Sequence, residues 1–199
     1  MFYWEDGAQL QDLVKEYIEG VLADVVPGRD GLSRDEAFNR LLGLYENGYV
    51  PSHDARALAL DRAQILTPYR GGPSGARGLS DYVRATYRSD AWPQFRYSET
   101  NFAHSDKIIR LRNYYVWNKE WEEKELRLSN GSIGVLCNSR SGRQVFFPES
   151  DWPLSWNRMD EDDFELAYGI TVHKAQGSEF QEVLVVLPER RALLSRELV

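Results

Sequence analysis

The 199-residue sequence contains only one cysteine and three histidines. Because Cys137 is alone, no internal disulfide can form, and these four residues, at positions 53, 104, 137 and 173, lack the spacing of metal ligands. The chain also has no run of 18 apolar residues and no signal-peptide pattern after Met1. We therefore expect a soluble, cytoplasmic protein with no metal of its own and no membrane partner.

Two common catalytic motifs are also missing from the sequence. No stretch reads G-x-x-x-x-G-K-[ST], the loop that holds the phosphates of ATP, and the glycines after Tyr69 are followed by no lysine in that arrangement. No G-x-S-x-G nucleophile turn occurs either. By themselves, these residues do not predict an autonomous catalytic site.

The composition supports a folded core but gives an ambiguous charge pattern. Hydrophobic residues make up 42% of the chain, which is enough to bury a core, and the net charge of −7 argues against nucleic-acid binding. Residues 62–118, however, carry 9 basic and 4 acidic side chains between two acidic flanks. This basic stretch is either a surface for a phosphate backbone or a solvated arginine-rich face.

Residues 1–61 are predicted to form a helical N-terminal segment. Apolar residues recur at helical spacing from Leu10 to Leu22, and Pro27 and Gly28 end this pattern. Ser33 and Glu36 have the spacing of a capping box, which predicts a second helix after Ser33. Residues 55–60 suggest a short third helix.

The pattern changes to alternating strand and helix after residue 62. Residues 63–67 are predicted to form a strand that stops at Pro68, followed by a glycine-rich loop and a helix over residues 79–88. Such a loop lies at the carboxyl end of its strand, where open α/β sheets bind ligands. The glycines are too numerous for packing alone, and Arg70 is suited to grip a phosphate while Tyr69 offers an aromatic face. The alternative is a flexible surface connection.

Residues 103–159 are predicted to form a small antiparallel barrel. Short strand-like runs contain Ile108, Ile133 and Val145, with turns at residues 130–131 and 141–142 and a polar loop over residues 113–129. Four aromatic residues border this loop: Tyr114, Tyr115, Trp117 and Trp121. We expect them to pack on the barrel; the alternative is a stacking surface for single-stranded DNA.

The strand and helix pattern resumes after the acidic run at residues 160–163. Residues 164–171 are predicted to be one strand, residues 173–177 a turn, and residues 183–187 a strand covered on both faces. The acidic runs at 120–125 and 160–165 are interpreted as solvated loops. Residues 62–102 and 160–199 thus form one discontinuous α/β domain, with residues 103–159 inserted. Residues 192–199 are apolar-periodic and have no helix cap, which suggests that the chain is cut from a longer one.

Three segments together resemble the RecD-like group of superfamily 1 helicases. The segment AYGITVHKAQGSEFQEVLVVLP, at residues 167–188, resembles the fifth motif of the group, and ILTPYRGGPSGARGLS, at 65–80, resembles the fourth. SDKIIRLRNYY, at 105–115, followed by NGSIGVL, at 130–136, resembles the SH3-like insertion of the group. Residues 1–61 carry no part of this resemblance.

The resemblance implies the second RecA-like domain of an ATP-dependent DNA helicase. Its fold would be α/β, a RecA-like parallel sheet with helices on both faces and an inserted small antiparallel SH3-like barrel. Arg70 would be catalytic, approaching the γ-phosphate. By motif position, the ATP-binding residues would be Tyr69, Arg70, Gln176, Gly177 and Glu179, and the DNA-binding residues Thr171, His173, Lys174 and Asn113.

The same resemblance defines what this sequence does not contain. In the family, ATP and Mg²⁺ bind between two RecA-like domains, and the first domain supplies the phosphate-loop lysine and the magnesium ligand. Neither those motifs nor the sixth motif, with its further arginine, occurs here. We expect ATP, single-stranded DNA and a first RecA-like domain as partners, and no ATP hydrolysis by this chain alone. The alternative is a non-catalytic module that binds nucleic acid or protein through the barrel.

Overall fold

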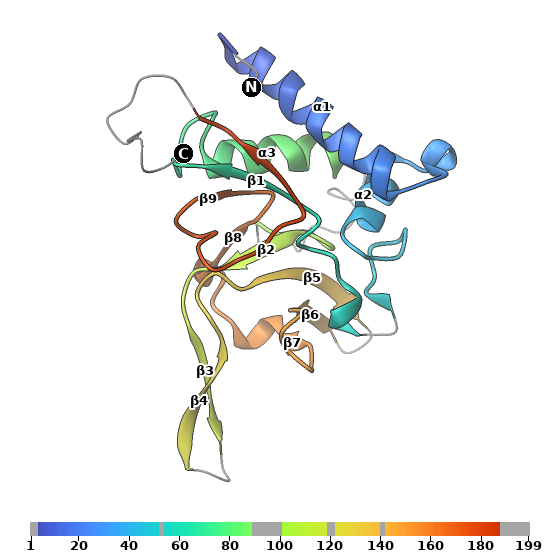
Figure 1. Cartoon of the computed structure of the whole chain (residues 1–199). Helices are drawn as coiled ribbons and strands as arrows, with labels where there is room; N and C mark the ends of the chain where they lie inside the picture. The colour runs from blue at the N-terminus through green and yellow to red at the C-terminus, as the bar shows by residue number, and fades with distance from the viewer. Residues whose placement is uncertain (1–3, 52–53, 89–100, 119–121, 140–141, 188–199) are drawn as a thin grey trace.

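The computed structural model describes residues 4–51, 54–88, 101–118, 122–139 and 142–187 (Figure 1). Three α-helices are present in these residues: α1 (Gly7–Val25), α2 (Arg34–Leu41) and α3 (Ala76–Tyr87). The strands are β1 (Ala63–Thr67), β2 (Lys107–Arg110), β3 (Tyr114–Asn118), β4 (Glu123–Leu128), β5 (Ile133–Ser139), β6 (Gly142–Phe146), β7 (Leu154–Ser155), β8 (Phe164–Leu166), β9 (Gly169–Thr171) and β10 (Glu182–Val185).

Local sequence explains the first two helices. The Asp6 carboxylate caps α1 by accepting hydrogen bonds from the backbone of Ala8 and Gln9, and the capping box of Ser33 and Glu36 begins α2 as predicted. The predicted third helix is wrong. Only Ala55–Ala57 form a turn of 3-10 helix, since the backbone is extended at Leu58, whose side chain is buried in the core.

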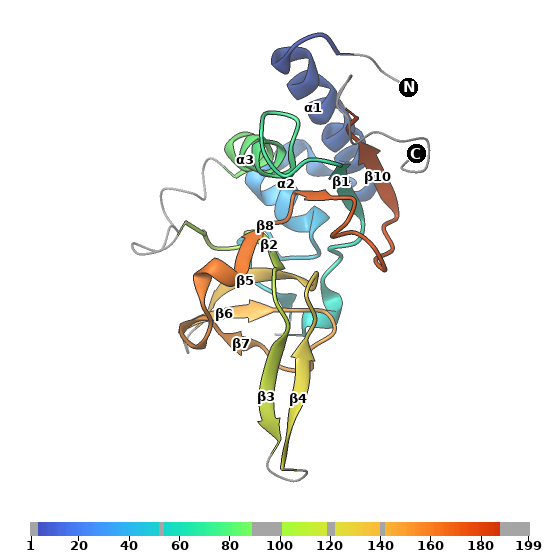
Figure 2. The same cartoon turned by 90° about the vertical axis from the view of Figure 1, so that its left-hand side faces the viewer.

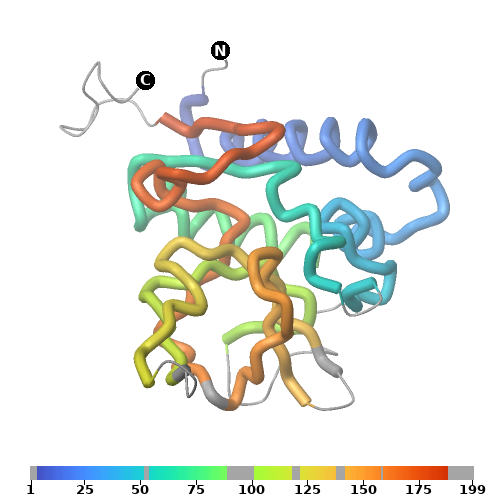
Figure 3. Tube along the Cα trace, turned by 60° about the horizontal axis from the view of Figure 1, so that its bottom comes forward, coloured from blue at the N-terminus to red at the C-terminus, as the bar shows by residue number. Residues whose placement is uncertain are grey.

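The parallel sheet places the predicted ligand-binding loops side by side. β1 lies between β10 and β9 and is parallel to both, and Thr67 at the end of β1 is paired with Thr171 at the end of β9. The loops that follow these strands therefore leave the sheet at the same edge. In Figure 3, α1 runs along one side of the molecule beside β10, and the antiparallel strands lie on the opposite side.

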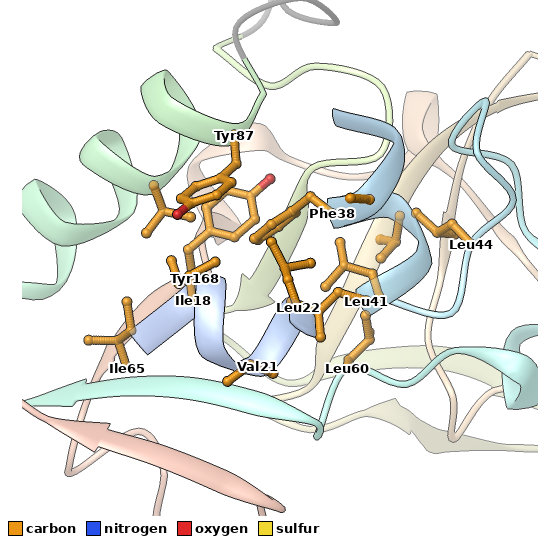
Figure 4. Packing of buried hydrophobic residues seen from close by; sticks show 14 of the residues in the cluster. Ile18, Val21, Leu22, Phe38, Leu41, Leu44, Leu60, Ile65, Tyr87 and Tyr168 are labelled. Atoms are coloured by element: carbon orange, nitrogen blue, oxygen red, sulfur yellow. The ribbon is translucent and has the colours of Figure 1, made fainter. Parts of the chain in front are cut away.

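The two faces of the parallel sheet are covered by different structures. On one face, Ile65 belongs to a cluster with Val21 of α1, Phe38 of α2 and Tyr87 of α3 (Figure 4). On the other face, Ile170 packs with Ile109 of β2, and Leu66 lies against this pair. In the part of the chain that the structure describes, α1, α2 and α3 all pack on the Ile65 side, together with Val135 and Phe146 of the antiparallel sheet, and Ile109 of that sheet packs on the other side. Helices on both faces stay a prediction.

The region predicted to be inserted, residues 103–159, contains antiparallel strands, as predicted, but not the predicted polar loop. Five strands pair in the order β7-β6-β5-β2-β8, while β3 and β4 form a separate hairpin that projects from the molecule (Figure 2). Residues 114–118 and 123–128, expected to lie in a loop, therefore form a ribbon. Most of the ribbon's side chains are not buried, so its sequence lacks the alternation of apolar and polar residues that predicts a strand with one buried face. An SH3-like barrel stays a prediction.

The predicted strand over residues 164–171 is two strands in two different sheets. β8 pairs antiparallel with β2, whereas β9 pairs parallel with β1. Between them, Ala167 and Tyr168 carry the chain from one sheet to the other, and the amide of Gln64 donates to both of their carbonyl oxygens, at 3.1 and 3.0 Å. The two-residue crossing fixes β8 beside the end of the parallel sheet.

The sequence predicted that residues 183–187 form a strand covered on both faces, but one face of β10 is exposed. Val183 is 41% exposed and Val185 51%, and β10 pairs with β1 on one side only among the described residues. A continuous apolar run indicates burial on both faces only when both sides of the sheet are covered. The apolar segment at 192–199 lies outside the described residues.

A cluster of buried polar groups joins the two sheets. Lys107 of β2 donates through Nζ to the Gln64 side chain, at 2.9 Å, and to the Ala63 carbonyl oxygen, at 3.2 Å. The Tyr168 hydroxyl donates to the buried carboxylate of Asp106, at 2.9 Å. Burial lowers the pKa of Lys107 to about 7 and raises the pKa of Asp106. A neutral Lys107 amine still has two protons to donate to its two acceptors, so both hydrogen bonds can persist when the amine is uncharged.

We predict that Lys107 makes stability depend on pH. Since its pKa is about 7 in the folded chain and near 10.5 otherwise, the unfolded chain binds an extra proton between these values. The free energy of unfolding should therefore rise with pH across this window, by at most about 1.4 kcal/mol per pH unit. In Lys107→Met, urea unfolding at pH 7 and pH 9 should lack this increment. The same pH dependence in both proteins would contradict the assignment.

Candidate functional site

The glycine-rich loop after β1 is compact. The Thr67 hydroxyl donates to the Ser74 carbonyl oxygen at 2.8 Å, and the amide nitrogens of Ala76 and Arg77 donate to the carbonyl oxygens of Tyr69 and Arg70. A Cβ at Gly75 would lie 2.2 Å from the Gly71 oxygen. Packing therefore does require glycine here, contrary to the sequence interpretation, and the loop holds Arg70 against the first turn of α3.

The second predicted loop follows β9 at the same edge of the sheet. Val172 donates its backbone N–H to the Thr67 carbonyl oxygen at 3.0 Å, so the two loops begin in contact. Thr171 ends β9 and accepts from the backbone of Lys174 at 2.9 Å, which closes a turn. Gly177 has a φ of +83° and allows the backbone to reverse again. Around these turns, three of the predicted side chains are exposed: His173, Gln176 and Glu179.

Three cationic side chains converge on Glu165 of β8. Its Oε1 accepts from Arg70, with Nε at 3.0 Å, and from Arg77, with Nη2 at 2.9 Å. Its Oε2 accepts from Lys174 Nζ at 2.6 Å. The structure thus joins a predicted ATP ligand and a predicted DNA ligand through one carboxylate. Glu165 and Arg77 were not singled out in the sequence, where the run at 160–165 was interpreted as a solvated loop.

The electrostatics of this cluster favour ionised Glu165. Burial alone would raise its pKa, but the hydrogen bonds from Lys174, Arg70 and Arg77 outweigh burial and lower the pKa to about 2. The ionised cluster therefore contributes stability above the ordinary pKa of a glutamate, and this contribution is lost as pH falls toward 2. The Glu165 side chain is 15% exposed, while Arg70 and Arg77 are 56% and 59% exposed.

Asn113 lies at the base of the projecting hairpin. Its side-chain oxygen accepts from the Asn130 backbone at 2.8 Å, and its amide donates to the Tyr115 hydroxyl at 3.2 Å. The turn at Gly131 lies next to the Lys174 carbonyl oxygen, 3.6 Å from the position of a Gly131 Cβ. Asn113 is therefore linked through this turn to the loop after β9.

The aromatic residues of the hairpin are more exposed than we expected. Tyr115 is 50% exposed and Trp117 61% exposed, so neither is packed in the core of the antiparallel sheet. Tyr114 is partly buried against that core, and Trp121 lies outside the described residues. The expectation of packing on the barrel thus fails for Tyr115 and Trp117.

Much of the basic stretch is structural rather than a surface. Arg88 is 2% exposed and donates to Asn39 at 2.7 Å, and Arg110 is 3% exposed and paired with Asp163 at 3.0 Å. Lys107 is also buried. Neither sequence interpretation, a DNA surface or a solvated face, describes these three residues. Arg70, Arg77 and Arg112 remain exposed.

The described residues contain neither a metal-binding cluster nor a membrane-spanning helix. No group of three or more His, Cys, Asp or Glu side chains there has an arrangement that could hold a metal ion. Among the same residues, no helix has both the length and the apolar character needed to cross a membrane.

Comparison with known proteins gives the class. The ATP-dependent RecD2 DNA helicase of Deinococcus radiodurans is 29% identical over 94% of this chain and 26% of its own length. The RecBCD enzyme subunit RecD is 26% identical over 79% of the chain in Mycobacterium tuberculosis and 30% over 73% in Haemophilus influenzae. The chain is therefore a RecD-like sequence, homologous to superfamily 1 helicases of the RecD group. No protein-family profile matches it.

The extent of these matches has two consequences. The chain spans about a quarter of the length of the Deinococcus and Mycobacterium relatives. The 94% coverage by the RecD2 match includes most of residues 1–61, so the relationship extends into the segment where the motifs showed none. This agrees with the packing of α1 and α2 in the same core as Ile65.

We predict that the pKa of Glu165 reports the cluster. Replacing either Arg70 or Lys174 by alanine should raise this pKa above about 2, because each variant removes a charged donor from the carboxylate. The matched control is Arg112→Ala, since Arg112 pairs with Asp163 instead. Carbon-13 NMR titration of the glutamate carboxyl groups measures the pKa. An unchanged value in both variants would show that the cluster does not form in solution.

Proposed function

We propose that this chain is the second RecA-like domain of an ATP-dependent DNA helicase, which moves along single-stranded DNA and unwinds duplexes. The observation that carries the proposal is the meeting of the two motif loops at the carboxyl ends of β1 and β9. The homology to RecD-like helicases supports it, as does the parallel sheet. We place the protein in the cytoplasm.

In this proposal, ATP binds at the loop after β1. Arg70 grips the γ-phosphate, for which a guanidinium on a rigid loop is suited because it can donate two parallel hydrogen bonds. Tyr69 lies against the nucleotide, and Gln176, Gly177 and Glu179 approach it from the loop after β9. The Mg²⁺ that accompanies ATP supplies charge neutralisation, and its ligands lie on the first RecA-like domain, outside this chain.

DNA binds along the loop after β9 and the base of the hairpin. Thr171, His173 and Lys174 contact the phosphate backbone, and Asn113 extends this path. Closing and opening of the cleft between the two RecA-like domains moves the protein along the strand. The ATP loop and the DNA loop begin at the same sheet edge, so a change at one loop can be passed to the other. Backbone contacts of this kind give binding that is insensitive to sequence and sensitive to salt.

This chain alone should not hydrolyse ATP. It has no phosphate-loop lysine, and loss of a single arginine from such a site costs about 10³ to 10⁵ in rate. A coupled assay of phosphate release, with and without single-stranded DNA, should give no turnover for the purified chain. In a longer protein that contains the first domain, Arg70→Ala should abolish hydrolysis and leave DNA binding intact. Turnover by the 199-residue chain would refute the proposal.

The DNA contacts are testable in the chain itself. Lys174→Ala should weaken binding of a fluorescent oligothymidylate and lower the slope of log affinity against log salt by about 1, since one phosphate contact is lost. His173→Ala should weaken binding as well. Arg56→Ala is the matched control, because Arg56 is exposed on the N-terminal segment and pairs with Asp54. Equal affinities in all four proteins would contradict the assigned DNA path.

One observation favours a second candidate, a non-catalytic module that binds single-stranded nucleic acid through the antiparallel region. Tyr115 and Trp117 are two positions apart in β3, so both lie on the same face of the hairpin, and both are exposed. Exposed aromatic faces stack on bases. If this module is the working surface, Trp117→Ala abolishes oligonucleotide binding while His173→Ala does not change it.

A further inference from the structure

The carboxylate of Glu165 is shared by residues to which the proposed function gives different tasks. Arg70 is the proposed phosphate ligand for ATP, and Lys174 is a proposed contact to the DNA backbone. Both side chains are instead bound to Glu165, the first through Oε1 and the second through Oε2. The carboxylate thus lies where it satisfies two cations that a bound nucleotide and a bound strand would each require.

Arg77 completes the cluster and has no assigned task. It is the second residue of α3, its Nη2 lies 2.9 Å from Glu165 Oε1, and its backbone nitrogen donates to the Arg70 carbonyl oxygen at 3.0 Å. Two guanidinium groups therefore share one carboxylate oxygen and remain more than half exposed. An anion from solvent can reach both, and a phosphate offers the oxygens to satisfy both together.

The backbone of Glu165 is held more firmly than the backbones of Arg70 and Lys174. Glu165 belongs to β8, where its backbone pairs with Ile109, a fully buried residue of β2. Arg70 and Lys174 lie on loops that follow strands. When a ligand competes for the cluster, the expected response is therefore that the cations move and the carboxylate stays.

We propose that Glu165 is an internal competitor of phosphate, which holds Arg70, Arg77 and Lys174 until nucleotide or DNA takes them, and that Arg77 is a second phosphate ligand beside Arg70. The inference rests on the proposed function for the identity of the two ligands. It adds two residues, Glu165 and Arg77, and a coupling between two binding events.

The sign of the coupling follows from the number of partners. Each cation in the cluster is attracted by the carboxylate and repelled by the other two cations, so removal of one cation increases the net attraction that holds the others. When a nucleotide phosphate takes Arg70, Lys174 is held more tightly and is less available to DNA. Because coupling between two binding sites is reciprocal, DNA weakens phosphate binding by the same factor.

The first experiment measures competition directly. Inorganic pyrophosphate is titrated into the nitrogen-15-labelled chain while NMR follows the Nε–H signals of the arginine side chains. In Glu165→Gln, which keeps the shape and removes the charge, pyrophosphate should bind about tenfold more tightly than in the wild type, because no internal carboxylate competes. Asp162→Asn, an equal charge change at an exposed site three residues away, should change the affinity far less.

A purely structural Glu165 gives the opposite result. Loss of a supporting ion pair would disorder the loops and weaken binding, so pyrophosphate affinity that is equal or lower in Glu165→Gln overturns the inference. If Glu165→Gln does not fold by circular dichroism, Arg77→Gln takes its place. This variant should bind pyrophosphate more weakly than the wild type, with Arg112→Gln as its control, and unchanged affinity overturns the role of Arg77.

The second experiment separates the inference from the proposed function. Oligothymidylate affinity is measured with and without saturating pyrophosphate. Pyrophosphate should weaken oligothymidylate binding by the wild type about fivefold to tenfold, at the lower end of the range expected of a coupling between two sites, and leave binding by Glu165→Gln unchanged. An equal effect in both proteins overturns the coupling. If neither protein binds the oligonucleotide, the DNA function fails, while tighter pyrophosphate binding in Glu165→Gln still supports the competition.

Discussion

The structure depends on the buried contact between Lys107 and Gln64. Lys107 belongs to the antiparallel sheet and Gln64 to the parallel sheet, and both residues are 2% exposed or less. The Gln64 amide reaches further, to the carbonyl oxygens of Ala167 and Tyr168, where the chain crosses between the sheets. Because unpaired polar groups are costly in a core, this set of hydrogen bonds permits few relative positions of the two sheets.

The position of Glu165 follows from that constraint. It precedes the crossing by two residues, and its strand must pair with β2 while β9 pairs with β1. The carboxylate is therefore held beside the edge where both motif loops begin. Three loop or helix-end cations, from segments almost a hundred residues apart in sequence, then meet at one anion. The coupling that we propose between phosphate and DNA is a consequence of how the sheets are joined.

Several elements were predictable from local pattern alone. The helical periodicity of Leu10 to Leu22 and the capping box at Ser33 describe interactions within a few residues, and both are confirmed. The motif resemblance is confirmed by the RecD-like relatives. The hairpin of β3 and β4 was missed because its strands are largely solvent-exposed and charged, which gave them the composition of a loop. Arg88 and Lys107 were counted as surface charge because a sequence does not show which cations have buried partners.

The sequence by itself thus determined the first two helices, the β1–loop–α3 unit, the family and the residues proposed to bind ligands. These are properties of short segments, in which neighbouring residues interact through the backbone. Only the tertiary structure decided which face of the sheet the helices cover, that residues 164–171 divide between two sheets, and that Glu165 faces Arg70, Arg77 and Lys174. Those facts depend on contacts between distant segments, and such contacts form only when burial of apolar surface brings the sheets together.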